Sequence, residues 1–167
     1  MIQEVAGDIL FSKAELIAHG IAPHDHFDSG LARALRERWP SLVRDYRHAT
    51  HSRAAEPGDI WPWAGVGEDG RGQRIVNLVT QNSIGDGPSA KPGKATLENV
   101  GHALRKLAKF IADEGVKSLA LPRLATGVGK LEWEDVKPLV QRHLGDLGIP
   151  VFIYTVYRPG EAAAERF

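Results

Sequence analysis

The sequence contains no cysteine among its 167 residues. Disulfide frameworks, cysteine-based zinc sites, iron–sulfur clusters and thiol nucleophiles are therefore excluded. An excess of either charge is also absent, since 21 Lys and Arg residues balance 21 Asp and Glu residues. A protein that mainly neutralises the phosphates of a long nucleic acid usually carries a basic excess. The balance therefore makes nucleic acid a less favoured partner.

Long apolar segments are absent as well. No run approaches the roughly 20 apolar residues that a membrane span needs, and Glu4, Asp8 and Lys13 interrupt the start of the chain, where a signal peptide has its apolar core. We therefore expect a cytoplasmic protein that does not enter a membrane. Hydrophobic residues make up 43% of the chain and charged residues 25%, which is typical of a globular protein with a buried core.

Apolar runs alternate with helical patterns along the chain. Strands are predicted over residues 1–10, 16–22, 59–63, 74–80, 118–122 and 151–156, and helices over 29–38, 40–46, 96–115 and 134–147. This alternation is typical of an α/β fold with a largely parallel central sheet. We expect one domain over residues 1–158, followed by a loose tail over 159–167.

Three loops are expected at the edge of the sheet where α/β proteins bind ligands, beyond the carboxyl ends of the strands. They span residues 7–9, 24–31 and 125–129. The last two precede helices, so their backbone N–H groups are placed to hold phosphate oxygens with help from the helix dipole. For each loop taken singly, the simpler interpretation is that its glycines only form a turn.

Several short motifs resemble a dinucleotide site, a metal site or a hydrolase nucleophile but lack the surroundings that these sites need. A GxGxxG pattern at 65–70 precedes a strand instead of a helix, so it predicts a hairpin turn and not a dinucleotide site. His24 and His26 lie two residues apart in a polar loop. Without a more distant ligand set, we expect a solvated or ligand-facing histidine and no metal. Ser29 is not part of a GxSxG nucleophile elbow.

Taken together, the loops resemble those of the macrodomain family of ADP-ribose-binding modules. The similarity is to the branch that contains the terminal ADP-ribose glycohydrolase and the antitoxin macrodomains that reverse DNA ADP-ribosylation, and it covers about residues 2–157. It is carried by residues 7–10, 17–21, 28–32 and 121–133, of which the last, a loop of small residues followed by Leu131-Glu132-Trp133 and a helix, is the most specific. The resemblance implies a three-layer α/β/α sandwich with a mixed central sheet.

The resemblance also implies roles for individual residues. Asp8 would accept a hydrogen bond from the exocyclic amine of adenine, the N–H of Ile9 would lie beside the ring, and Tyr157 would stack on it. The remaining ligand-binding residues would surround the diphosphate and the distal ribose: His19, Gly20, Ser29, Gly30, Leu31, Ala125, Thr126, Gly127, Val128 and Gly129.

Two departures from the family pattern concern catalysis. The glycohydrolase relatives carry a lysine shortly after a strand that ends in Val-Thr, whereas here the same strand end is followed by Gln81 and Asn82. An aspartate that some relatives carry in the second glycine loop is replaced by Gly129. We therefore expect no covalent lysyl route. Gln81, Asn82 and His26 are the candidates for positioning an attacking water.

The resemblance implies an ADP-ribose-binding macrodomain that hydrolyses mono-ADP-ribose from acidic protein side chains by water attack at C1″. Its partners would be ADP-ribose and ADP-ribosylated proteins; it would act as a monomer, without metal or cofactor. Two alternatives stay open. The missing lysine and aspartate favour a non-catalytic reader of ADP-ribosylated partners, and the loop over residues 83–92 favours a phosphatase acting on ADP-ribose 1″-phosphate.

Overall fold

Six strands form the central sheet of the protein, whose computed structural model describes all residues from 1 to 167. The strands are β1 (Ile2–Gly7), β2 (Leu16–Ile21), β3 (Ile60–Val66), β4 (Gly72–Val79), β7 (Leu119–Pro122) and β8 (Val151–Tyr157). Their order across the sheet is β1-β8-β7-β2-β4-β3. All neighbours run parallel except β3 and β4. The sheet is therefore mixed, and β3 lies at its edge, as Pro62 requires.

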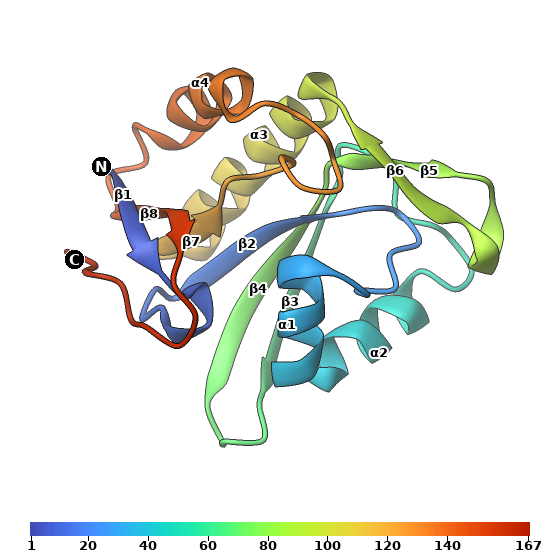
Figure 1. Cartoon of the computed structure of the whole chain (residues 1–167), viewed down its shortest axis with the longest axis horizontal. Helices are drawn as coiled ribbons and strands as arrows, with labels where there is room; N and C mark the ends of the chain where they lie inside the picture. The colour runs from blue at the N-terminus through green and yellow to red at the C-terminus, as the bar shows by residue number, and fades with distance from the viewer.

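Four helices cover the two faces of this sheet (Figure 1). They are α1 (Gly30–Arg38), α2 (Pro40–Ala49), α3 (Leu97–Glu114) and α4 (Trp133–Leu144). Side chains of α1 and α2 belong to one core cluster, whereas those of α3 and α4 belong to another on the opposite face. The expected three-layer α/β/α sandwich is confirmed. None of the helices combines the length and the apolar character needed to cross a bilayer.

Strand β2 shows why the central strands read as continuous apolar runs. Leu16 and Ala18 belong to the core below α3 and α4, whereas Ile17 and Ile21 belong to the core below α1 and α2. Successive side chains point to opposite faces of a sheet, so a strand between two helix layers buries both faces and is largely apolar, with His19 as the polar exception in β2.

Helix α3 begins and ends at the residues that the sequence predicts. The hydroxyl of Thr96 accepts a hydrogen bond from the backbone N–H of Asn99 at 3.0 Å, which caps the first turn. Gly115 ends the helix with φ +63°, in the left-handed region that a glycine adopts without steric cost. In the first turn of the helix, the side-chain amide of Asn99 donates to the carbonyl of Thr80 at 3.4 Å, so the helix starts beside the end of β4.

A separate antiparallel hairpin links β4 to α3. It consists of β5 (Gln81–Ile84) and β6 (Lys91–Ala95), with a short 3-10 turn over Gly87–Ser89 at its tip. In Figure 1 the hairpin projects from one end of the sheet. The expectation of a loop over residues 83–92 is therefore wrong at both of its ends, which belong to β5 and β6. These strands lack an alternating apolar pattern because the hairpin does not cover the core.

The C-terminal segment is packed against the domain, so the prediction of a loose tail is wrong. The carboxylate of Glu165 accepts hydrogen bonds from the hydroxyls of Ser12 at 2.6 Å and Tyr154 at 2.8 Å. The ring of Phe167 meets that of Phe152 edge-on at 5.0 Å between centroids. These contacts join residues far apart in sequence, and local composition gives no sign of them.

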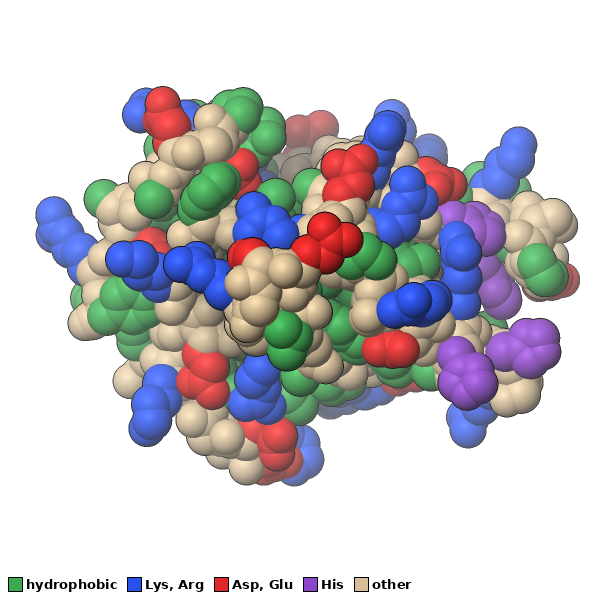
Figure 2. All heavy atoms as spheres, turned by 90° about the horizontal axis from the view of Figure 1, so that it is seen from below, with side chains coloured by type: hydrophobic (Ala, Val, Ile, Leu, Met, Phe, Trp, Pro, Cys, Tyr) green, Lys and Arg blue, Asp and Glu red, His purple; other side chains and the backbone are tan.

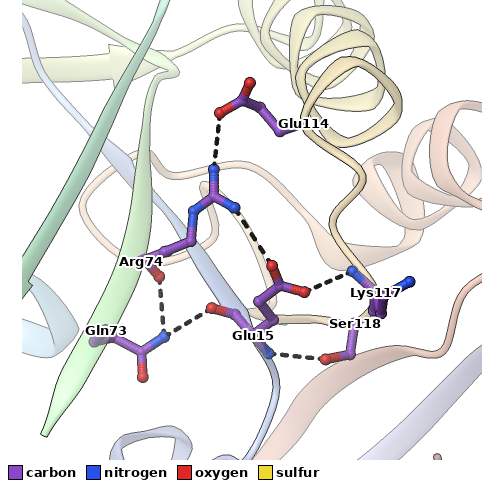
Figure 3. Close-up of polar contacts among 6 residues, drawn as sticks. All are labelled: Glu15, Gln73, Arg74, Glu114, Lys117 and Ser118. Atoms are coloured by element: carbon purple, nitrogen blue, oxygen red, sulfur yellow. Dashed lines mark hydrogen bonds and ion pairs between the residues drawn. The ribbon is translucent and has the colours of Figure 1, made fainter.

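A polar network ties the sheet together at the amino end of β2 and β4 (Figure 3). One oxygen of Glu15 accepts from the backbone N–H of Lys117 at 2.8 Å, and the other lies 3.4 Å from Arg74. Arg74 also pairs with Glu114 at the end of α3, at 3.1 Å. This network lies at the amino ends of the strands. A cleft lies at the opposite edge of the sheet, beyond the carboxyl ends of the strands.

Candidate functional site

Two adjoining cavities lie beyond the carboxyl ends of β1, β2, β4 and β7. The main cavity has a volume of about 530 Å³ and the side cavity about 340 Å³. Gly30, Leu31 and Pro122 line both, so the two form one continuous cleft. These volumes are in the range of small-molecule sites.

All the predicted ligand-binding residues lie in this cleft. Those in the side cavity are Asp8, Ile9, Gly30, Leu31 and Tyr157. Those in the main cavity are His19, Gly20, Ser29, Gly30, Leu31, Ala125, Thr126, Gly127, Val128 and Gly129. Segments that are more than a hundred residues apart in the chain are thus brought together along one edge of the sheet.

Asp8 is held firmly in the side cavity. Its carboxylate accepts backbone hydrogen bonds from Leu10 and from Gly160 of the C-terminal segment, both at 3.0 Å. A carboxylate offers about four acceptor positions, so Asp8 can still accept an amine from a ligand. The ring of Tyr157 is 73% exposed at the same cavity and offers a face for stacking.

The loop between β7 and α4 presents its backbone to the main cavity. Ala125 and Lys130 have φ values of +62° and +65°, which are uncommon for residues with a side chain. Hydrogen bonds from Leu131 N–H to Ala125 and from Lys130 N–H to Gly127 close the turn. The N–H groups of residues 126–129 donate no hydrogen bond within the protein, so they are available to an anion.

The start of α1 also lines the main cavity. Ser29 is the N-cap, but its hydroxyl makes no capping hydrogen bond. The first N–H groups of a helix have no partner within the helix, and those of Gly30, Leu31 and Ala32 have none elsewhere in the protein. Two sets of free backbone donors, from α1 and from residues 126–129, thus line one cavity. Such an arrangement suits the two phosphates of a nucleotide.

A strained turn forms another wall of the cleft. Phe27 is fully buried and has φ +57°, a conformation that costs a bulky residue about 1–3 kcal/mol. The carboxylate of Asp25 supports it by accepting from the N–H groups of Ala22 at 2.9 Å and Phe27 at 2.7 Å. The turn therefore holds the adjoining His26 at the cavity.

His19 is an uncharged part of the cavity wall. Its Nε2 lies 2.6 Å from Oδ1 of Asn77, whose amide nitrogen donates to the carbonyl of Trp61 at 3.0 Å. This fixes the orientation of the Asn77 amide, so His19 Nε2 is the donor. Burial lowers the pKa of His19, although the Asn77 hydrogen bond and the nearby charge of Asp25 act in the opposite direction.

The three candidates for positioning water do not all lie in the cavity. Gln81 and His26 line it, whereas Asn82 does not. Gln81 donates through Nε2 to the carbonyl of Gly93 at 3.0 Å, and Oδ1 of Asn82 accepts from Asn99 at 3.1 Å. His26 Nε2 lies 3.2 Å from a carbonyl oxygen at the tip of the β5–β6 hairpin. Two of the three side chains are therefore placed to meet a ligand.

The lysine missing from the family pattern has no substitute in the cavity. Lys91 and Lys94 lie on β6 and do not line it. A Cβ at position 129 would lie 2.6 Å from the carbonyl oxygen of Ala125 and 2.9 Å from Cβ of Ala95. Gly129 thus occupies a position without room for the aspartate of some relatives. No group of three or more His, Asp or Glu side chains is arranged to hold a metal ion.

Thr80 is a cavity residue that sequence reasoning missed. It is fully buried and its hydroxyl has no hydrogen-bond partner among the protein's own groups. The sequence shows that this strand ends in Val-Thr, but nothing in it marks the threonine hydroxyl as unpaired. Arg123 and Asp28 also line the cavity, and Asp28 is paired with Arg36 at 2.9 Å.

A third hollow, the histidine pocket, adjoins the main cavity at His26. It has a volume of about 270 Å³, and its lining also includes His24, His51 and Arg47. Figure 2 shows histidine side chains gathered at one end of the face it draws. Arg47 forms no ion pair. Asp25 lines the histidine pocket as well, so the cleft continues into a histidine-rich recess that carries charges of both signs.

Comparison with known proteins identifies the architecture. No model of a known protein family matches the chain. A DNA ADP-ribosyl transferase–DNA ADP-ribosyl glycohydrolase fusion protein from Thermosipho africanus is 29% identical over 90% of this chain and 40% of that protein. The human ADP-ribose glycohydrolase OARD1 is 25% identical over 93% of this chain and 91% of that protein.

The solved macrodomain of Thermus aquaticus DarG aligns with a TM-score of 0.77 and 25% identity, covering 93% of this chain and 98% of that one. The chain has the macrodomain fold. In sequence and structure it is similar to macrodomains of the terminal ADP-ribose glycohydrolase type. It spans about two fifths of the length of the Thermosipho africanus protein and nearly the whole length of the human one.

Proposed function

We propose that this macrodomain binds ADP-ribose and hydrolyses mono-ADP-ribose from acidic side chains of modified proteins, acting as a monomer. The observation that carries the proposal is the pair of free backbone N–H sets, at the start of α1 and over residues 126–129, that line one cavity. The names of the human and Thermosipho africanus relatives, which are both glycohydrolases of ADP-ribosyl groups, support it.

The ligand is proposed to lie along the cleft from the side cavity to the main cavity. Adenine would be held by the carboxylate of Asp8, the N–H of Ile9 and the ring of Tyr157. The diphosphate would accept hydrogen bonds from the two sets of backbone donors. The distal ribose would then reach the part of the main cavity lined by Gln81 and His26.

Hydrolysis would proceed by attack of water on C1″ of the distal ribose. The water oxygen bonds to C1″ while the bond from C1″ to the ester oxygen breaks. The electron pair of that bond leaves on the acceptor carboxylate, and one proton of the water is released. The protein's part in this scheme is to hold the ester and the water in attack geometry, which by itself lowers barriers substantially.

The test is release of free ADP-ribose from a glutamate-modified protein at high enzyme concentration. We expect release by the wild type and a loss of turnover, with retained ADP-ribose affinity, in Gln81→Ala. Gln141→Ala is the matched control because Gln141 is an exposed residue of α4 outside the cleft. Release from ADP-ribosylated DNA instead of protein would correct the acceptor and leave the hydrolase proposal in place.

One observation favours a reader without turnover: no lysine lines the cavity. Under that alternative the protein binds ADP-ribose but releases none from either substrate. Calorimetry with ADP-ribose, run beside the release assay, separates the two functions. Phosphate release from ADP-ribose 1″-phosphate without ester hydrolysis would instead point to a phosphatase.

A further inference from the structure

Thr80 carries a polar group for which the protein itself provides no partner. The residue joins β4 to β5 and is fully buried. Its backbone is held on both sides, because its N–H donates to the carbonyl of Ile21 at 3.1 Å and its carbonyl accepts from Asn99 at 3.4 Å. Only Oγ1 is left without a hydrogen bond.

A buried hydroxyl without a partner costs free energy, since it has lost its bonds to water. Native proteins keep few such groups, and each one calls for an explanation. Thr80 lines the main cavity beside Gln81. Its hydroxyl is therefore a buried polar group in the wall of the cavity, and a small polar molecule bound at that wall is a partner that the protein does not itself supply.

Gly20 on the neighbouring strand β2 makes room for this hydroxyl. A Cβ at position 20 would lie 2.7 Å from Thr80 Oγ1, closer than such atoms approach. Gly20 also lines the main cavity. The absence of a side chain at Gly20 and the unpaired hydroxyl of Thr80 thus form one arrangement, contributed by two adjacent parallel strands.

We propose that the Thr80 hydroxyl binds the water that attacks C1″, which makes Thr80 a positioning residue of the proposed hydrolysis. A hydroxyl accepts two hydrogen bonds and donates one. Accepting one from the water would leave an oxygen lone pair free to bond to C1″. No bond of Thr80 itself forms or breaks. The inference rests on the proposed function, to which it adds the group that holds the nucleophile.

The decisive variants are Thr80→Val and Thr80→Ser, assayed for ADP-ribose release, ADP-ribose affinity and thermal stability. We expect Val, which keeps the branched shape without the hydroxyl, to lower kcat by about tenfold to a hundredfold, the scale of a misplaced reactant. Its Kd for ADP-ribose should stay within about twofold, and its Tm should not fall, because no hydrogen bond is lost. Ser, which restores the hydroxyl, should regain most of the turnover.

Ser118→Ala is the matched control. The hydroxyl of Ser118 accepts from the backbone N–H of Glu15 at 2.8 Å, and the residue lies outside the cleft, just before β7 begins. Losing this paired hydroxyl should lower Tm and leave kcat unchanged, the opposite of what is expected at Thr80. Gly20→Ala, which crowds the Thr80 hydroxyl, should lower kcat as Thr80→Val does.

Four results would overturn the proposal. Unchanged kcat in Thr80→Val would show that the hydroxyl does not hold the water. A fall in Tm without a fall in kcat would show that the hydroxyl is structural. A loss of ADP-ribose affinity at constant kcat would assign it to the ribose instead. If the wild type releases no ADP-ribose, the hydrolase function fails and this proposal with it, whereas an active wild type with an equally active Val variant refutes only the role of Thr80.

Discussion

Gly129 is a residue whose lack of a side chain is required by its surroundings. Its backbone accepts a hydrogen bond from Ala95 at 3.0 Å and passes so close to Ala125 that a Cβ has no room. We expect Gly129→Ala to lower the free energy of unfolding by about 1–3 kcal/mol, the usual cost of overpacking. Gly127→Ala in the same loop is the control, because a Cβ there meets nothing within 4 Å. Equal urea midpoints for the two variants would contradict this account.

His19 should make stability depend on pH. Because burial lowers its pKa in the folded state, the unfolded chain binds a proton near pH 6.5 that the folded chain does not. Stability therefore rises with pH in this window and falls as pH drops below about 6.5, by at most about 1.4 kcal/mol per pH unit. His19→Gln, which does not titrate, should flatten the slope between pH 7 and pH 5 in denaturant titrations. An unchanged slope would assign the dependence to other groups.

Single residues also mark the limit of prediction from sequence. The resemblance to macrodomain motifs predicts that Asp8, Ser29 and residues 125–129 lie close together. The prediction is possible because the positions of loops at strand ends follow from the order of the strands and helices along the chain. The unpaired state of the Thr80 hydroxyl depends on where Gly20 lies on the adjacent strand. A relation of that kind between two strands is set by packing, which a single sequence does not reveal.

The C-terminal segment acts as an element that supports the side cavity. Glu165 connects it to Ser12 and Tyr154, while Gly160 bonds directly to the Asp8 carboxylate. We expect Glu165→Ala to lower the free energy of unfolding by about 2 kcal/mol, since hydrogen bonds to a charged group are lost and a part-buried tyrosine hydroxyl is left unpaired. The measurement is urea denaturation.

Glu161→Ala is the control within the same segment, because its carboxylate makes no hydrogen bond or ion pair. It should match the wild type. An equal loss in the two variants would mean that the charge of the segment matters and the specific contacts of Glu165 do not.

Among the elements, those that build the core were predictable and those that only shape the cleft were not. Helix α3 shows an apolar stripe and two capping signals, so its bounds follow from the sequence. The hairpin of β5 and β6 buries little apolar surface, and the C-terminal segment attaches through isolated side chains. Periodicity detects burial of a regular face, and neither of these segments has one.

At the scale of the whole molecule, ligand binding should raise thermal stability. A ligand that binds only the folded state adds about 2.7 kcal/mol at a hundred times its Kd, and each kcal/mol shifts Tm by roughly 2–4 °C for a chain of this size. We therefore expect ADP-ribose to raise Tm by about 5–10 °C in a thermal-shift assay, and AMP at equal concentration to raise it less. Equal shifts would show that the diphosphate and the distal ribose are not recognised.

The backbone construction of the main cavity has a consequence for mutagenesis. Residues 126 to 128 keep their N–H groups when they are changed to alanine, so an alanine scan would report these positions as unimportant even if they hold phosphate oxygens. Only proline removes the donor. The same property lets side chains in these loops drift over evolution while the anion site persists. Proteins at about 25% identity can then bind the same ligand through backbone N–H groups, which a comparison of side chains does not detect.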